Sequence, residues 1–165
     1  MKLNKNFAID KINTILLLTG ITFLLSCSGN KTIFEKYHHF PNLSWNRFEF
    51  VTFSVPVEDV SAAYDIFLTL RHIPEMQFRE LEFNITMFLS GEEMRTADYT
   101  FRLFDSEGRR LSNCLGDLCD ITMPIRQGFY FTEPGTVTIE IENKFTKMEL
   151  PGMMKVGLIV KKAGK

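Results

Sequence analysis

Residues 136–142 read TVTIEIE, and this stretch decides the fold class, because apolar and polar side chains alternate through the whole of it. The apolar residues Val137, Ile139 and Ile141 share one parity, and polar residues such as Glu140 have the other. A period of two residues is typical of a β-strand with one face in the core and the other in solvent. We therefore predict a central strand whose three apolar side chains face the core.

The same alternation recurs along most of the chain. Each run is short and is bounded by turn-forming residues, for example DSEGRR at residues 105–110 and EPGT at residues 133–136. Strands are expected at residues 47–55, 64–71, 81–89, 99–103, 121–131, 136–142 and 156–162. The first strand is expected to stop at Pro56, and short helical turns are expected only at residues 56–63 and 144–154. This all-β pattern predicts an antiparallel β-sandwich with a jelly-roll or immunoglobulin-like topology.

Residues 1–26 have the three parts of a secretory signal peptide. A basic start carries Lys2, Lys5 and Lys11, and a mostly apolar run follows at residues 12–25. That run is shorter than the roughly 20 residues that a helix needs to cross a bilayer, so an uncleaved anchor helix is not expected. The sequence therefore predicts a cleaved signal peptide followed by an exported domain.

The sequence LLSC at residues 24–27 resembles a bacterial lipobox, in which the chain is cut before the cysteine and a diacylglycerol is attached to its thiol. We expect Cys27 to be the lipidated N-terminus, because acyl chains hold a folded domain on a membrane. The alternative is an ordinary cysteine near a signal peptide that is cut elsewhere. Residues 27–46 are expected to form a lipidated tether, and residues 47–165 the β-sandwich domain.

The residues that follow Cys27, SGNK, contain no acidic tract. By resemblance to the sorting signals of Gram-negative lipoproteins, this favours a lipid anchor on the periplasmic face of the outer membrane. The whole chain has a formal net charge of −1 and shows no basic patch, so nucleic acid is not expected as a partner.

The remaining cysteines are Cys114 and Cys119. In an oxidising compartment we expect them to form a disulfide, with two unpaired thiols and a metal site as the alternatives. A metal site is disfavoured because no second pair of ligands lies nearby. His38 and His39 are adjacent, so on an extended chain their rings point to opposite sides, and exposed histidines are expected rather than ligands.

Motifs that carry catalysis are absent from the sequence. It contains no Gly-x-Ser-x-Gly nucleophile elbow, no phosphate-binding Gly-rich loop and no dinucleotide-binding fingerprint. No catalytic residue, cofactor or metal is therefore assigned, and a small hydrolase ranks last among the candidate functions.

One stretch, NCLGDLCDITMPI from residue 113, is a candidate for a functional loop. Gly116 suggests a backbone conformation with positive φ, and Asp117 is suited to cap the same turn. One interpretation is turn chemistry alone. The other is that Leu115, Gly116 and Asp117 form a loop that docks a partner, since loops on a rigid scaffold often carry binding residues.

Four motifs follow one another in a set order: YDIFLTLRH at 64–72, LGD at 115–117, FTEPGTVTIEI at 131–141 and LPGMMKVGLIV at 150–160. Each is common by itself. Their shared order, together with the lipobox, covers most of the mature chain and resembles the gliding motility lipoprotein GldH family of Bacteroidetes. The sequence departs from this pattern at Cys114, where relatives often have a small residue, and at Lys155, where they have an acidic one.

The resemblance implies a non-enzymatic outer-membrane lipoprotein that is accessory to gliding motility and to envelope machinery linked to type IX secretion. Its expected partners are the membrane, through the N-terminal lipid, and other envelope proteins. The family offers no catalytic residues to carry over. The alternative is a carbohydrate-binding β-sandwich lipoprotein, whose aromatic platform would come from Trp45, Tyr99 or Tyr130.

Overall fold

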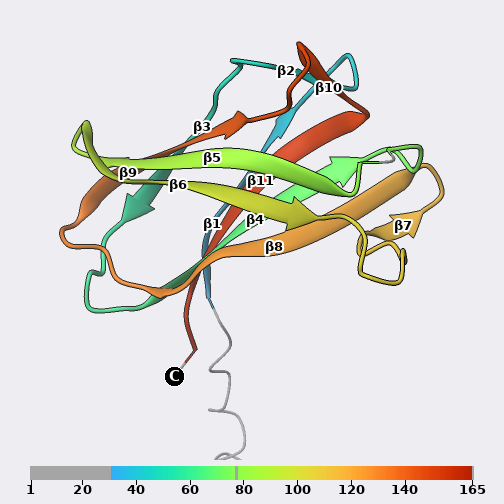
Figure 1. Cartoon of the computed structure of the whole chain (residues 1–165). Helices are drawn as coiled ribbons and strands as arrows, with labels where there is room; N and C mark the ends of the chain where they lie inside the picture. Colours follow the sequence, from blue (N-terminus) through green and yellow to red (C-terminus); the bar gives the residue numbers. More distant parts are fainter. Residues whose placement is uncertain (1–30, 77, 165) are drawn as a thin grey trace, which may run out of the picture. The chain divides into compact units, whose positions relative to one another are not determined.

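The computed structural model describes residues 31–76 and 78–164, and every regular element in these ranges is a β-strand (Figure 1). No helix in this part of the chain is long and apolar enough to cross a membrane. The strands are β1 (Thr32–His39), β2 (Ser44–Asn46), β3 (Val51–Val57), β4 (Tyr64–His72), β5 (Glu80–Leu89), β6 (Glu92–Arg102), β7 (Asn113–Leu115), β8 (Leu118–Phe129), β9 (Gly135–Asn143), β10 (Glu149–Pro151) and β11 (Met153–Lys162). The predicted all-β class is confirmed.

The strands form two packed sheets and a short ribbon, all with antiparallel pairing. One sheet has the order β1-β11-β4-β8-β7, the other has the order β3-β9-β5-β6, and β10 pairs with β2. Among the eight long strands, β1 pairs with β11, β3 with β9, β4 with β8 and β5 with β6. This pairing of first with last, working inward, is that of a jelly roll, so the structure decides between the two predicted topologies.

Strand β9 has the predicted position and register. It lies between β3 and β5, and Val137, Ile139 and Ile141 are all fully buried. Ile139 is paired with Phe53 on one side and with Met87 on the other, both of which are also buried. The prediction that Val137, Ile139 and Ile141 face the core is therefore confirmed.

Two prolines lie inside strands rather than ending them. Strand β3 runs through Pro56, which the sequence led us to expect as its end, and β8 runs through Pro124. Strand β3 is an edge strand, and beyond Asp120 strand β8 has a hydrogen-bonded neighbour, β4, on one side only. Proline has no N–H to donate, which costs little on the free side of an edge strand.

The expected tether is folded from Thr32 onward, which moves the start of the domain earlier than the predicted residue 47. Strand β1 pairs with β11 along its length, and in β2 the side chain of Trp45 is fully buried between the rings of Phe40 and Phe83. The sequence pattern did not show this because β1 is an edge strand that is mostly exposed. Residues 1–30, including the predicted signal peptide and Cys27, lie outside the described residues.

Two further local expectations need correction. The segments 56–63 and 144–154, expected as helical turns, contain no helix, and the second contributes β10 to the ribbon. Strand β6 begins at Glu92, well before Tyr99, because Ser90 and Gly91 form a tight hairpin with β5. Both turn residues have positive φ, 53° and 85°, as a two-residue type I′ turn requires.

The strand registers define two ends of the sandwich. Thr32 is paired with Lys161 at one end, which we call the proximal end because the chain enters the fold there. At the opposite end, which we call the distal end, Met153 is paired with His72 and His72 with Cys119. The β2–β10 ribbon and the β7–β8 hairpin both lie at the distal end (Figure 1).

Candidate functional site

The predicted loop at residues 115–117 is the tip of the β7–β8 hairpin. Leu115 is paired with Leu118, which leaves Gly116 and Asp117 as a two-residue turn. Gly116 has a φ of 58°, as predicted, and glycine at the first central position with positive φ is the signature of a type II′ turn. A Cβ at Gly116 would meet nothing within 4 Å, so the requirement for glycine comes from the backbone conformation alone.

The hairpin tip holds an apolar side chain in solvent. Leu115 is 87% exposed, more than any other large apolar residue in the described part of the chain. Its cross-strand partner Leu118 is half-buried, so the tip pairs one exposed leucine with one that is partly covered. The Leu115 side chain does not stabilise the fold through the hydrophobic effect, because folding removes little of its apolar surface from water.

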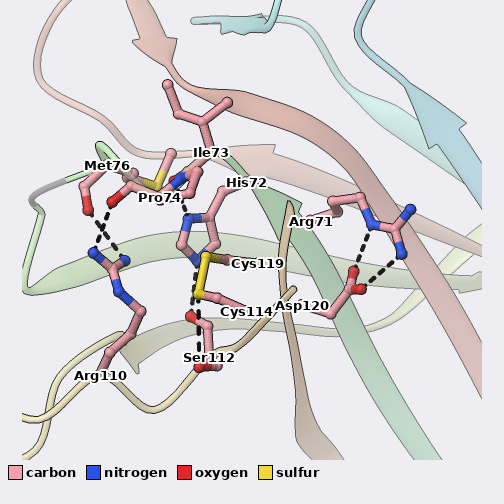
Figure 2. The surroundings of a disulfide bond; sticks show 10 residues. All are labelled: Arg71, His72, Ile73, Pro74, Met76, Arg110, Ser112, Cys114, Cys119 and Asp120. Carbon is pink, nitrogen blue, oxygen red and sulfur yellow. Dashed lines mark hydrogen bonds and ion pairs between the residues drawn. A yellow bond between two sulfur atoms is a disulfide. The ribbon is translucent and has the colours of Figure 1, made fainter. Parts of the chain in front are cut away.

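A disulfide joins Cys114 to Cys119 directly below the tip (Figure 2). The two residues are cross-strand partners, with Cys114 exposed on β7 and Cys119 fully buried on β8. The bond therefore ties a three-residue edge strand to a strand that is anchored in the core. In the described residues no group of three His, Cys, Asp or Glu side chains is placed to hold a metal ion.

His72 supports the base of the hairpin from inside the sandwich. Its ring is fully buried, with Nδ1 2.7 Å from the carbonyl oxygen of Ile73 and Nε2 2.8 Å from Oγ of Ser112 (Figure 2). Because a carbonyl only accepts, Nδ1 carries the proton, and Nε2 accepts the hydrogen bond from the Ser112 hydroxyl. Burial lowers the pKa of His72, which favours this neutral form.

Two arginines brace the same region. The Arg71 guanidinium makes a bidentate ion pair with Asp120, at 2.7 and 2.6 Å, and this contact lowers the pKa of the Asp120 carboxyl. Arg110 donates to the carbonyl oxygen of Pro74 at 2.7 Å, and its guanidinium lies 4.8 Å from the centre of the Phe104 ring. The first contact ties β8 to β4 next to the disulfide, and the second joins the loop before β7 to the loop after β4.

Other exposed apolar side chains lie at the distal end with Leu115: Leu43, Phe48, Phe50, Leu111 and Met148. Leu43 and Met148 flank the β2–β10 ribbon, where the Gly152 amide donates to the Leu43 carbonyl and the Arg47 amide to the Met148 carbonyl. Leu43 and Phe48 also have positive φ, 53° and 67°, although neither is glycine. Bulky residues avoid this conformation, and such strain is concentrated at functional positions.

The histidines of the described residues and Trp45 lie in different surroundings. His72 and Ser112 form a hydrogen-bonded pair in which both side chains are buried. His38 is half-buried against Phe40, and His39 is exposed on the other side of β1. Trp45 is fully buried, so it is not a platform for a sugar ring.

The turn at Gly116 was predicted, but the β7–β8 hairpin that carries it and the side chains that support it were not. Tyr64, Ile66, Leu68 and Leu70 face the core, and His72 continues the same parity, a signal that predicts a buried histidine. The ion pair of Arg71 with Asp120 had no such signal, because these residues are brought together only by the pairing of β4 with β8.

The fold and site define a jelly-roll β-sandwich that presents a disulfide-linked hairpin and several exposed apolar side chains at one end. The chain belongs to the GldH lipoprotein family, whose family model matches residues 32–160. It is thereby a gliding-motility-associated lipoprotein of the cell envelope.

No curated protein matches the chain. Among solved structures, it is similar to the dimeric latent PorU from Porphyromonas gingivalis, with 7% sequence identity and a TM-score of 0.29. That match covers 84% of this chain but only 14% of the PorU chain, so this chain spans about a seventh of its length.

Proposed function

We propose that the protein is a non-enzymatic accessory lipoprotein that binds other envelope proteins of the gliding and type IX secretion-linked machinery through its distal end. The observation that carries this proposal is the 87% exposed Leu115, on a hairpin whose two strands are joined by a disulfide and whose second strand is tied to β4 by the ion pair of Arg71 with Asp120. Interfaces take most of their binding energy from a few residues, and a side chain that is already held in place loses little conformational entropy on binding.

The proposed anchor is lipid on Cys27, in the periplasmic face of the outer membrane. The chain enters the fold at Thr32, at the proximal end, so a lipid on Cys27 leaves the distal end as the part of the domain farthest from the point of attachment. This arrangement supports a role in which the proximal end stays near the membrane and the distal end meets proteins. Cys27→Ala should release the protein from membranes, and retention after a salt wash would contradict a lipid anchor.

The binding proposal is tested by photo-crosslinking in intact cells. A photoreactive residue at position 115 should give a discrete crosslinked product with another envelope protein. The matched control carries the same residue at Tyr130, which is 59% exposed but follows β8 at the proximal end. Equal crosslinking from both positions, or none from position 115, would contradict docking through the hairpin.

The substitution Leu115→Asp provides a second test of the same surface. Because Leu115 is almost fully exposed, the folded state should keep its stability, as surface substitutions usually change it by less than about 0.5 kcal/mol. Co-purification of the crosslinked partner should fall. A stable and lipidated variant that retains the partner in full would remove the hairpin tip from the interface.

A further inference from the structure

A pocket of about 290 Å³ opens at the proximal end, beside the point where the chain enters β1. Charged side chains from three separate segments line it: Lys31 precedes β1, Glu58 and Asp59 follow β3, and Lys162 ends β11. The main chain holds two of these segments together, since the amide of Lys162 donates to the carbonyl oxygen of Lys31 at 2.8 Å. That hydrogen bond fixes the side of the pocket that β1 and β11 form.

Two of the four charges already satisfy one another. Lys162 Nζ lies 2.8 Å from Oδ2 of Asp59, while the amide and hydroxyl of Ser61 donate to Oδ1 at 3.0 and 2.6 Å. Tyr64 donates its hydroxyl hydrogen to the main-chain carbonyl of Asp59 at 2.7 Å. The hydrogen bond from Lys162, with those from Ser61, lowers the pKa of Asp59 to about 2. Asp59 is ionised at neutral pH, and the pair forms a fixed wall.

The other two charged side chains that line the pocket are Lys31, which is positive, and Glu58, which is negative. Neither Lys31 nor Glu58 takes part in an ion pair with any described residue. A ligand that carries one anionic and one cationic group complements Lys31 and Glu58, because its anion meets the ammonium of Lys31 and its cation meets the carboxylate of Glu58. A ligand with one charge meets only one of these two side chains.

We propose that this pocket binds a phosphoethanolamine group, with the phosphate on Lys31 and the ammonium on Glu58, and that the group is the headgroup of a membrane phospholipid. The proposal rests on the proposed lipid anchor at Cys27. Lys31 is the fourth residue after Cys27, and at about 3.5 Å per residue the lipidated cysteine stays within roughly 14 Å of Lys31. A headgroup in the same leaflet is within reach, and its binding would orient the sandwich on the membrane.

The experiment uses the lipidated mature protein in nanodiscs of phosphatidylglycerol, which supply no ethanolamine. Added phosphoethanolamine should shift the amide NMR signals of Lys31 and Glu58 in a saturable way. Ethanolamine alone and inorganic phosphate alone should each bind at least about tenfold more weakly, because each probe loses one charge-assisted hydrogen bond. No saturable shift, or equal binding of a one-charge probe, overturns the proposal.

Matched variants locate the site. Lys31→Gln and Glu58→Gln should each weaken phosphoethanolamine binding by about tenfold. Lys36→Gln, which removes an exposed lysine on β1 that does not line the pocket, should leave it unchanged. Equal effects of Lys31→Gln and Lys36→Gln would show general attraction by charge and overturn the site.

A second nanodisc distinguishes the two sources of the ligand. In nanodiscs that contain phosphatidylethanolamine, the shifts should be present from the start, and added phosphoethanolamine should change nothing further. Identical titrations in both nanodiscs would assign the pocket to a free ligand and overturn the membrane source. Mass spectrometry of the same sample reports the lipid on Cys27, and crosslinking at position 115 reports the distal partner, so failure of the proposed function is seen separately.

Discussion

Replacing Ile139 by alanine tests the contact that organises the whole sandwich. Ile139 is fully buried on β9, between Phe53 on β3 and Met87 on β5. The substitution removes three carbon groups from the core, at about 0.8 kcal/mol each, or about 2.5 kcal/mol of lost burial. Hydrogen bonding of β9 to strands on both sides limits collapse into the cavity, so we expect a total loss of about 4 kcal/mol.

The assay is urea unfolding followed by the fluorescence of Trp45, the only tryptophan of the chain, which is fully buried in the folded state. The loss corresponds to a fall in melting temperature of roughly 15 °C for a domain of this size. Glu140→Ala is the matched control on the outward face of the same strand, and it should cost less than about 0.5 kcal/mol. Equal losses for the two variants would refute the assigned register and with it the packing of the two sheets.

The remaining predictions concern the hairpin and the proximal pocket. Gly116→Val should cost about 1–2 kcal/mol because of the positive φ, whereas Gly116→Asn should cost clearly less, as urea unfolding will show. Reduction of the Cys114–Cys119 disulfide, which closes a loop of sequence separation 5, should lower stability by about 2 kcal/mol; an unchanged unfolding midpoint with and without reductant would contradict this. Because the pKa of Asp59 is lowered to about 2 in the folded state, its ionised carboxylate stabilises the folded state fully above the usual carboxyl pKa of about 4. This stabilisation is lost as pH falls toward 2, so the free energies of unfolding of wild type and Asp59→Asn, plotted against pH, should converge near pH 2. If the two plots stay parallel down to pH 2, the ion pair of Asp59 with Lys162 does not contribute to the stability of the fold.

Local patterns predicted more of the fold than of the site. The parity of apolar residues located β4, β5 and β9 and the faces that they bury, because alternation is a property of each strand by itself. The hairpin turn was also predictable, since Gly116 is suited to the backbone conformation that the turn requires. The start of the domain was not, because β1 exposes most of its side chains and is held by pairing to β11, more than a hundred residues further along the chain.

The sequence by itself determined the strand class, the inward face of each central strand, the glycine turn and, through ordered motifs, the family. These features depend on neighbouring residues, whose spacing fixes which side of a strand each side chain occupies. Only the tertiary structure decided on the jelly roll, on the support of the hairpin by His72, Ser112 and Arg71, and on the pocket that Lys31 and Glu58 line. Those arrangements join residues far apart in the chain, and two strands of similar pattern can pair with several others until the packing of both sheets selects one order.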